Sequence, residues 1–116
     1  MASFRQGDVI KVPFPYTDRP TRQSRPALVV STGAIEDAHG LLWVVMITSA
    51  ENRRWPGDVT VNNLATAGLP VPSIIRTAKI ATIEATDAAR LGRVPTVLFR
   101  QVALRLKQVM GFDASD

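Results

Sequence analysis

The chain has 116 residues, 46% of them hydrophobic, with 14 Lys and Arg against 10 Asp and Glu and a formal net charge of +4. This length suits one domain, residues 1–116, which can bury roughly two-thirds of its unfolded surface without a metal or a disulfide. The absence of cysteine excludes a disulfide framework, thiolate zinc sites and a cysteine nucleophile, and the single histidine, His39, excludes a catalytic histidine pair within one chain. We expect no metal and no cofactor.

The sequence has no pattern of a secretory signal or a membrane span. The opening residues, MASFRQGD, contain no apolar core, and the longest apolar run, 41–47, is far too short to cross a bilayer. We therefore expect a soluble protein in the reducing cytoplasm, with no membrane partner.

The first half of the chain carries short β patterns. Residues 8–14 alternate in polarity, and Pro13 predicts that this strand ends or lies at a sheet edge. The nearly continuous apolar runs 27–31 and 41–48 are typical of strands buried on both faces. Between these two runs, residues 32–40 form a connection that can hold one turn of helix.

The second half adds further strands and then helices. The expected order is a strand at 58–61, an irregular segment at 62–72, strands at 73–78 and 79–84, a short helix at 86–91 and a final helix at 95–110. Thr86 and Gly92 bound the short helix, and Gly111 ends the final one. The expected buried face of the final helix holds Phe99, Val102, Ala103, Leu106, Val109 and Met110. This pattern favours a small barrel over a parallel sheet.

Two polar loops, 15–24 and 50–57, concentrate positive charge. Five of the 14 cations lie in or beside them, at positions 19, 22, 25, 53 and 54, and Trp55 joins the second group. Single-stranded nucleic acid is held by such pairings, because bases stack on aromatic rings while arginines follow the backbone. Trp55 could instead anchor its own loop by packing against Pro56.

Three blocks of sequence, in one order, resemble a known family. They are GDVIKVPFPYTD at 7–18, RPALVVS at 25–31 and MITS at 46–49, and the stretches 68–83 and 91–93 continue the same order. Together they resemble the MazF/PemK (Kid) toxins of type II toxin–antitoxin pairs over roughly residues 7–110. The remaining residues, 111–116, are expected to form a flexible tail.

The resemblance implies a fold, an activity and partners. The fold would be α+β and mainly β, a small SH3-like antiparallel barrel of MazF/CcdB type with a short helix and a C-terminal helix, usually in a homodimer. The activity would be metal-independent, sequence-selective cleavage of single-stranded RNA, leaving a 2′,3′-cyclic phosphate and a 5′-hydroxyl. The partner would be a cognate antitoxin, a small protein whose disordered acidic tail covers the RNA groove.

The resemblance also implies site residues. Arg25 matches the catalytic arginine of the family and Thr48 its catalytic threonine. Because arginine is already protonated, it is a poor proton acceptor, and we expect Arg25 to stabilise charge and act as an acid rather than a base. We expect Thr48 to donate a hydrogen bond through its hydroxyl. The expected RNA-binding residues are Arg19, Arg22, Pro26, Ser49, Arg53, Arg54, Trp55 and Arg76. Without the resemblance, Thr48 could be an ordinary strand residue and Arg25 a partner of Asp18 or Asp58.

One position departs from the family pattern. Some members carry an acidic residue two positions after the arginine that matches Arg76, whereas this chain has Ala78. A carboxylate-assisted mechanism at this place is therefore in doubt, and Asp18 and Asp58 are the nearest substitutes by loop position.

Two other functions stay open. The chain could be a non-catalytic CcdB-like toxin that acts on a protein such as gyrase, or an SH3-like protein-binding module without enzymatic activity. The RP block at 25–26 and the ITS block at 47–49 favour the endoribonuclease.

Overall fold

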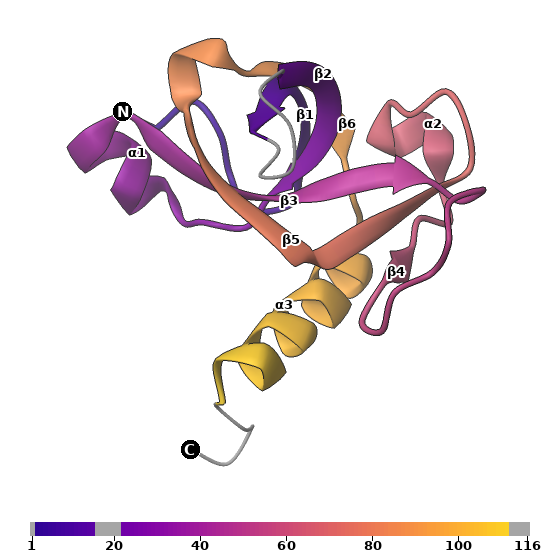
Figure 1. The fold of residues 1–116 in the computed structure, drawn as a ribbon. Coiled ribbons are helices and arrows are strands. Elements are labelled where there is room, and N and C mark those ends of the chain that lie inside the picture. The colour runs from indigo at the N-terminus through magenta and orange to yellow at the C-terminus, as the bar shows by residue number, and fades with distance from the viewer. Residues whose placement is uncertain (1, 16–21, 112–116) are drawn as a thin grey trace.

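A computed structural model describes residues 2–15 and 22–111, the side chains of residues 15, 22 and 23 excepted. The elements are β1 (Asp8–Pro15), β2 (Arg22–Val29), α1 (Gly33–His39), β3 (Leu41–Ser49), β4 (Val59–Thr60), α2 (Leu64–Ala67), β5 (Ser73–Glu84), the 3₁₀ turn η1 (Ala85–Asp87), β6 (Ala89–Arg93) and α3 (Thr96–Met110). The strands form one antiparallel sheet in the order β4-β5-β3-β2-β1-β6, which curls into a half-barrel (Figure 1). The predicted mainly β, barrel-like fold is confirmed.

The central strands bury both of their faces. Val9, Leu28 and Val45 belong to one apolar cluster, which also takes in residues of α2 and α3, whereas their neighbours Ile10 and Val44 belong to a second cluster. Successive side chains of a strand point to opposite faces, so a strand with a core on each side needs an unbroken apolar run. The expectation is confirmed for residues 27–29 and for most of 41–48, but Trp43 is 47% exposed. The bounds of the first strand and of the loop expected at 15–24 are wrong, because β2 pairs with β1 from Arg22 onward and ends at Val29.

Strand β1 has two neighbours over only half of its length. It pairs with β2 as far as Pro15, but its pairing with β6 covers only Asp8 to Lys11. Pro13 pairs with Ser24 of β2, but on its other side β1 has no strand partner at this position among the described residues, as is typical of proline in a sheet. The edge position predicted from Pro13 is confirmed.

A buried carboxylate joins β1 to β6. The Asp8 side chain is fully buried, and its Oδ1 accepts from Arg93 Nη1 at 2.7 Å and from Arg90 Nη2 at 3.1 Å. Its Oδ2 accepts from the Arg5 backbone N–H at 2.9 Å. Since a buried carboxylate is stable only when it is paired, these contacts explain why an acidic residue can begin a core strand.

The segment expected to form a helix at 86–91 is a strand, and that prediction is wrong. Only η1 is helical there, and β6 follows, with Arg90 paired to Ile10 and Gly92 to Val9 across the sheet. Local propensity is outweighed because these residues complete the open edge of β1 and supply two arginines to Asp8.

Three other expectations need smaller corrections. The connection 32–40 holds a seven-residue helix, α1, and the segment expected to be irregular contains one helical turn, α2, whose N-cap Asn63 accepts from the Thr66 N–H at 3.1 Å. The two strands expected within 73–84 form one strand, β5. Its register against β3 shifts between the pairs Val45–Ile80 and Met46–Arg76, and this bulge bends the sheet.

Helix α3 begins and ends where the sequence predicts, but its buried face is shorter. Leu98, which the sequence pattern missed, and Val102 are buried, whereas Val109 and Met110 are 75% and 65% exposed. The reason is geometric, because the C-terminal end of α3 extends away from the sheet (Figure 1). The predicted face is therefore right for the first turns and wrong for the last.

No helix in the described part of the chain is long and apolar enough to cross a membrane. Of the tail expected at 111–116, only Gly111 lies within the described residues, so the prediction of a flexible tail lies outside them.

Candidate functional site

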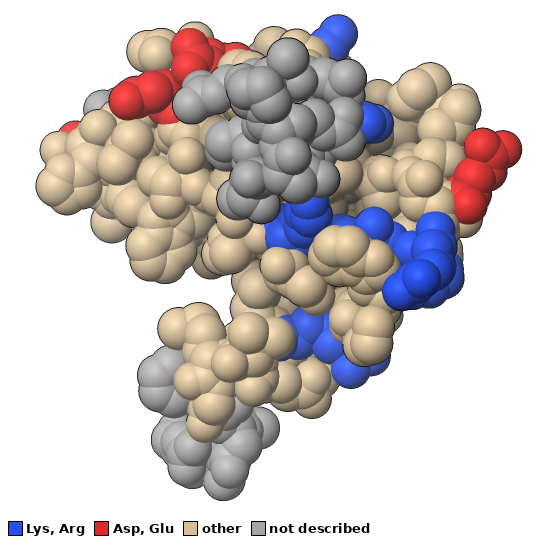
Figure 2. Space-filling view, viewed as in Figure 1, with Lys and Arg blue, Asp and Glu red and all other residues tan. Residues whose placement is uncertain are grey.

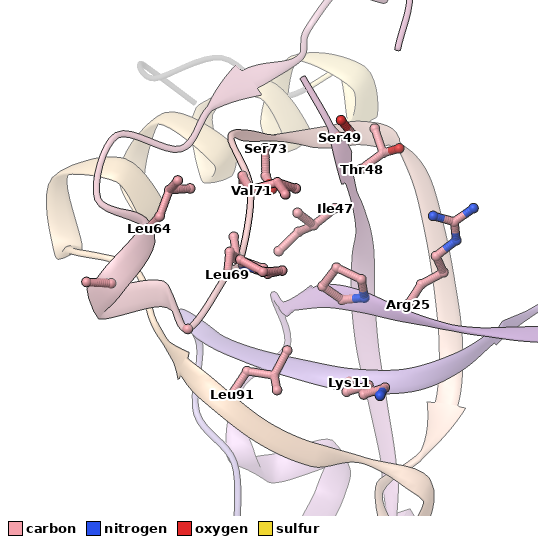
Figure 3. A pocket seen from close by; sticks show the side chains of 14 residues that line it. Lys11, Arg25, Ile47, Thr48, Ser49, Leu64, Leu69, Val71, Ser73 and Leu91 are labelled. Carbon is pink, nitrogen blue, oxygen red and sulfur yellow. The ribbon is translucent and has the colours of Figure 1, made fainter. Parts of the chain in front are cut away.

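A pocket of about 590 Å³ opens where the end of β3 meets β1, β2 and the α2–β5 connection (Figure 3). Its polar lining includes Lys11, Arg25, Thr48, Ser49 and Ser73. The apolar lining consists of Pro26, Ile47, Leu64, Ala65, Gly68, Leu69, Pro70, Val71 and Leu91. Four residues that sequence analysis assigned to the site, at positions 25, 26, 48 and 49, therefore meet at one pocket.

Arg25 and Thr48 lie side by side at one rim of this pocket (Figure 3). The antiparallel pairing of β2 with β3 ends at Ala27 and Met46, and continuing this register by two residues leads from these to positions 25 and 48. Both side chains then project from the same face of neighbouring strands. Thr48 is buried and Arg25 is half-buried, which places a guanidinium and a hydroxyl beside one cavity.

The wall of the pocket opposite this rim is built by close packing of α2 against β6. A Cβ atom on Gly68 would lie 2.1 Å from the Leu91 carbonyl oxygen, and one on Gly92 would lie 2.4 Å from the Thr66 carbonyl oxygen. Only glycine permits this approach. The contact brings Leu64 and Leu91 to the same wall.

The apolar wall offers few side-chain hydrogen-bond donors. The Ser73 hydroxyl is buried and donates to the Val71 carbonyl oxygen at 2.8 Å, so its hydrogen is already used. A flat apolar group can therefore rest on Leu64, Val71 and Leu91, whereas an anionic group is drawn to the rim that carries Arg25 and Lys11.

Arg76 lies outside this pocket and is buried behind the second polar loop. It pairs with Asp58, Nη2 to Oδ2 at 3.1 Å, and donates to the Arg53 carbonyl oxygen at 2.5 Å. Its guanidinium also stacks on the Trp55 ring, 4.2 Å from the centroid. These contacts favour a role in holding the loop over the direct RNA contact that the sequence predicts for Arg76.

Trp55 and Asp58 are tied into the same cluster. The Trp55 N–H donates to Asp58 Oδ2 at 2.8 Å, and the Lys79 ammonium lies 5.7 Å from the ring centroid. Trp55 is half-buried, so a loop-anchoring function is favoured for it. Asp58, considered above as a partner of Arg25 or a proton acceptor, accepts instead from Arg76 and Trp55.

The remaining predicted cations lie apart or outside the described side chains. Arg53 and Arg54 are exposed, and Arg54 Nη2 donates to Thr60 Oγ1 at 3.2 Å. Arg19 lies outside the described residues, as does Asp18, and of Arg22 only the backbone is described. On the face seen in Figure 2, Lys and Arg gather around the middle of β5 and the β3–β4 connection, while Asp and Glu lie toward the outer edges.

Comparison with models of known protein families identifies one family. A model of the PemK-like, MazF-like toxins of type II toxin–antitoxin systems matches residues 5–110. The chain belongs to this family. A search of curated proteins gave no match.

Solved structures of MazF proteins share the fold of this MazF-like toxin. A crystal structure of MazF from Deinococcus radiodurans matches with a TM-score of 0.77 and 21% identity over 94% of this chain and 97% of that one. A MazE–MazF complex from the same organism gives 0.76 and 20% over 95% and 98%. An endoribonuclease in complex with its cognate antitoxin, from mycobacterial species, gives 0.74 and 18% over 97% and 98%.

The departure from the family pattern after Arg76 has a structural counterpart. Ala78 is exposed, and the bulge of β5 lies between positions 76 and 80. Among the described residues, no group of three or more His, Asp or Glu side chains is placed to hold a metal ion. The charged and hydroxyl groups of the pocket in this MazF-like toxin are therefore Lys11, Arg25, Thr48, Ser49 and Ser73.

Sequence reasoning missed three polar residues at this site: Lys11, Asn52 and Ser73, the first residue of β5. Lys11 stands opposite Pro26 in the β1–β2 register, so its alternation with Ile10 and its place beside the RP block could have located it. Asn52 donates from its side-chain amide to Thr48 Oγ1 at 2.6 Å. Nothing in the sequence spacing predicts that contact, because it depends on how the loop after β3 turns back.

Proposed function

We propose that this MazF-like toxin is a metal-independent endoribonuclease that cleaves single-stranded RNA in the cytoplasm, leaving a 2′,3′-cyclic phosphate and a 5′-hydroxyl. The observation that carries the proposal is the juxtaposition of Arg25 and Thr48 at the rim of one pocket. The match to the family over residues 5–110 supports it.

The reaction needs no group other than the RNA itself as nucleophile. The 2′ oxygen passes its proton to solvent water and bonds to the adjacent phosphorus, while the bond from phosphorus to the 5′ oxygen breaks and that oxygen gains a proton. Charge grows on the phosphoryl oxygens in the transition state, so Arg25 stabilises them and supplies the proton for the leaving oxygen, which it then regains from solvent. The Thr48 hydroxyl adds a neutral hydrogen bond.

The rest of the pocket suits a single strand. Lys11 adds a second cation near Arg25 for the backbone, and the apolar wall at Leu64, Val71 and Leu91 accepts an unstacked base or sugar. Pro26 and Ser49 line the space between them. The exposed Arg53 and Arg54 extend the basic surface along the β3–β4 connection, and this surface would follow the RNA beyond the pocket.

We further propose an antitoxin partner and a homodimer. The net charge of +4 and the basic pocket rim suit an acidic antitoxin segment, which would compete with RNA for the same groove. The exposed apolar side chains Leu104, Val109 and Met110 on α3 suit burial against a second copy.

Cleavage of a defined single-stranded RNA by the purified chain in EDTA tests the proposal. We expect fragments whose new 5′ ends accept phosphate from a kinase without prior phosphatase treatment, and whose new 3′ ends resist ligation. Arg25→Ala should lower the cleavage rate by about 100-fold or more, since it removes the charge that faces the transition state.

Arg100→Ala is the matched control, because Arg100 is an exposed arginine on α3 and lies away from the pocket. Its cleavage rate should equal that of the unsubstituted chain, and both variants should melt at the same temperature as that chain. Undiminished cleavage by Arg25→Ala would reject the assigned site. Intact RNA together with inhibited DNA supercoiling would instead favour a CcdB-like action on gyrase.

A further inference from the structure

Asn52 makes a short contact with the hydroxyl of Thr48. Its Nδ2 donates to Thr48 Oγ1 across 2.6 Å, and Thr48 itself is buried. A hydroxyl has one hydrogen and two acceptor lone pairs. Because Asn52 occupies a lone pair, the hydroxyl hydrogen must point to some other acceptor.

The loop that carries Asn52 is fixed at both ends. On one side, the Ala50 N–H donates to the Pro72 carbonyl oxygen at 2.9 Å and the Asn52 N–H to the Ser49 carbonyl oxygen at 3.1 Å. On the other side, buried Arg76 donates to the carbonyl oxygen of Arg53, the next residue. Although Asn52 is exposed, these hydrogen bonds fix its backbone, so its short side chain is positioned to contact Thr48.

We propose that Asn52 is a positioning residue that sets the direction of the Thr48 hydroxyl hydrogen. With the Asn52 amide as donor, that hydrogen is free for a phosphoryl oxygen bound beside Arg25. The inference rests on the proposed RNA cleavage, and it adds a residue that acts through Thr48 without touching the reacting atoms.

The polarity of the contact makes the proposal specific. Asn52→Ala removes the donor and leaves the hydroxyl free to rotate. Asn52→Asp replaces the donor with an acceptor of nearly the same shape, to which Thr48 would give its hydrogen. The hydroxyl would then be withdrawn from the phosphate, so Asn52→Asp should be slower than Asn52→Ala.

Single-turnover cleavage with protein in excess, titrated to saturation, separates chemistry from binding. We expect Asn52→Ala to lower the maximal rate about ten-fold, the effect of one lost hydrogen bond, while the protein concentration that gives half of that rate changes less than about two-fold. Asn52→Asp should lower the maximal rate further. Asn62→Asp, an exposed substitution of the same charge outside the pocket, should leave the maximal rate unchanged.

A double-mutant cycle shows whether Asn52 acts through Thr48. In a Thr48→Val background the hydroxyl is absent, so adding Asn52→Ala should change the maximal rate by less than about two-fold. In a Thr48→Ser background, which keeps a hydroxyl, the ten-fold loss should persist. Independent effects in the valine background would overturn the positioning role, because they would mean that Asn52 acts elsewhere.

Different results would reject the proposed RNA cleavage and the proposed role of Asn52. If the unsubstituted chain cuts RNA and the Asn52 variants cut at the same maximal rate, the role of Asn52 is rejected while the proposed function stands. If the unsubstituted chain cuts no RNA, the proposed function falls and the role of Asn52 in it falls too. Equal melting temperatures of the Asn52→Ala variant and the unsubstituted chain would show that a lost rate is not lost folding.

Discussion

Arg76 illustrates how one side chain can serve a site that it does not line. Its guanidinium is planar with several donors, and it uses them at once on the Asp58 carboxylate and the Arg53 carbonyl while its face stacks on Trp55. A compact ammonium group cannot make this set of contacts. The arginine therefore ties the β3–β4 connection, which carries Asn52, to the middle of β5.

Arg76→Lys should lower the free energy of unfolding by about 2 kcal/mol, since the buried Asp58 side chain loses one of the two hydrogen bonds that it accepts from Arg76 and the stack on Trp55 is lost. Urea unfolding followed by circular dichroism measures the change. Arg54→Lys is the matched control, because Arg54 is exposed and makes one hydrogen bond, to Thr60; it should shift stability by less than about 0.5 kcal/mol. Equal effects of the two variants would contradict the bracing role of Arg76.

At the scale of elements, the pocket depends on how closely α2 approaches β6. The two backbones touch at Gly68 and Gly92, and the contact sets the distance between the leucine wall and the rim that carries Arg25. The close contact between α2 and β6 also explains why most of the segment 86–91 is not helical. A strand at this place pairs with β1 and offers a flat backbone on which α2 can rest.

Gly92→Ala should lower the free energy of unfolding by about 2 to 3 kcal/mol, because its methyl group would meet backbone atoms of residues 66 and 67 that cannot rotate away. It should also weaken RNA binding by displacing the wall. Gly40→Ala is the comparison: its φ of +68° strains alanine, but no atom lies within 4 Å, so about 1 kcal/mol is expected. A smaller loss for Gly92→Ala than for Gly40→Ala in chemical denaturation would refute the close contact.

At the scale of the whole molecule, the uneven placement of charge is more important for the proposed RNA binding than the net charge. The net charge of +4 is modest, but Lys11 and Arg25 line the same pocket as Thr48, and acidic residues lie toward the edges of the face in Figure 2. A cation beside a bound phosphate releases a counterion when RNA binds. The contribution of each cation can therefore be read from the salt dependence of the affinity.

Lys11→Ala should weaken binding of a single-stranded RNA and reduce the slope of log affinity against log salt by about 0.7, the value for one phosphate contact on a single strand. Fluorescence anisotropy with a 2′-O-methyl oligonucleotide, which binds but lacks the nucleophile, measures this slope. Lys107→Ala, at the exposed end of α3, should leave it unchanged. An unaltered slope for Lys11→Ala would exclude Lys11 from the RNA path.

The parts of the fold that sequence predicts best are those with strong periodic patterns. The strand at 41–48, the apolar centre of β2 at 27–29 and the bounds of α3 are predicted correctly. Continuous apolar runs indicate the strands, and Pro95 and Gly111 mark the two ends of the helix. Segments 62–72 and 86–91 are short and weakly patterned, so tertiary contacts decide them. The sequence wrongly predicts that the end of α3 is buried for a related reason. Periodicity shows which side chains share one face of a helix, but not whether another element packs against that face.

The same division applies to the candidate site. The RP and ITS blocks identify Arg25 and Thr48 because both blocks match the family pattern, although Arg25 lies within β2 and not at its end. Lys11, Asn52 and the apolar wall escape sequence reasoning, since each is defined by a neighbour from another element. The same holds for Arg76, whose basic character suggests RNA but whose burial against Asp58 gives it a structural partner.

By itself, the sequence determines the chemical inventory of this protein: no cysteine, one histidine, an excess of arginine and β segments long enough for a small barrel. Because the chain has no cysteine and one histidine, the side chains that it can offer for catalysis are mainly arginine, lysine, hydroxyl and carboxylate groups. Only the tertiary structure decided which of these groups meet. The reason is that strand register, the glycine contact between α2 and β6, and the Arg76–Asp58 pair act between residues far apart in the chain. Local patterns carry no information about such distances.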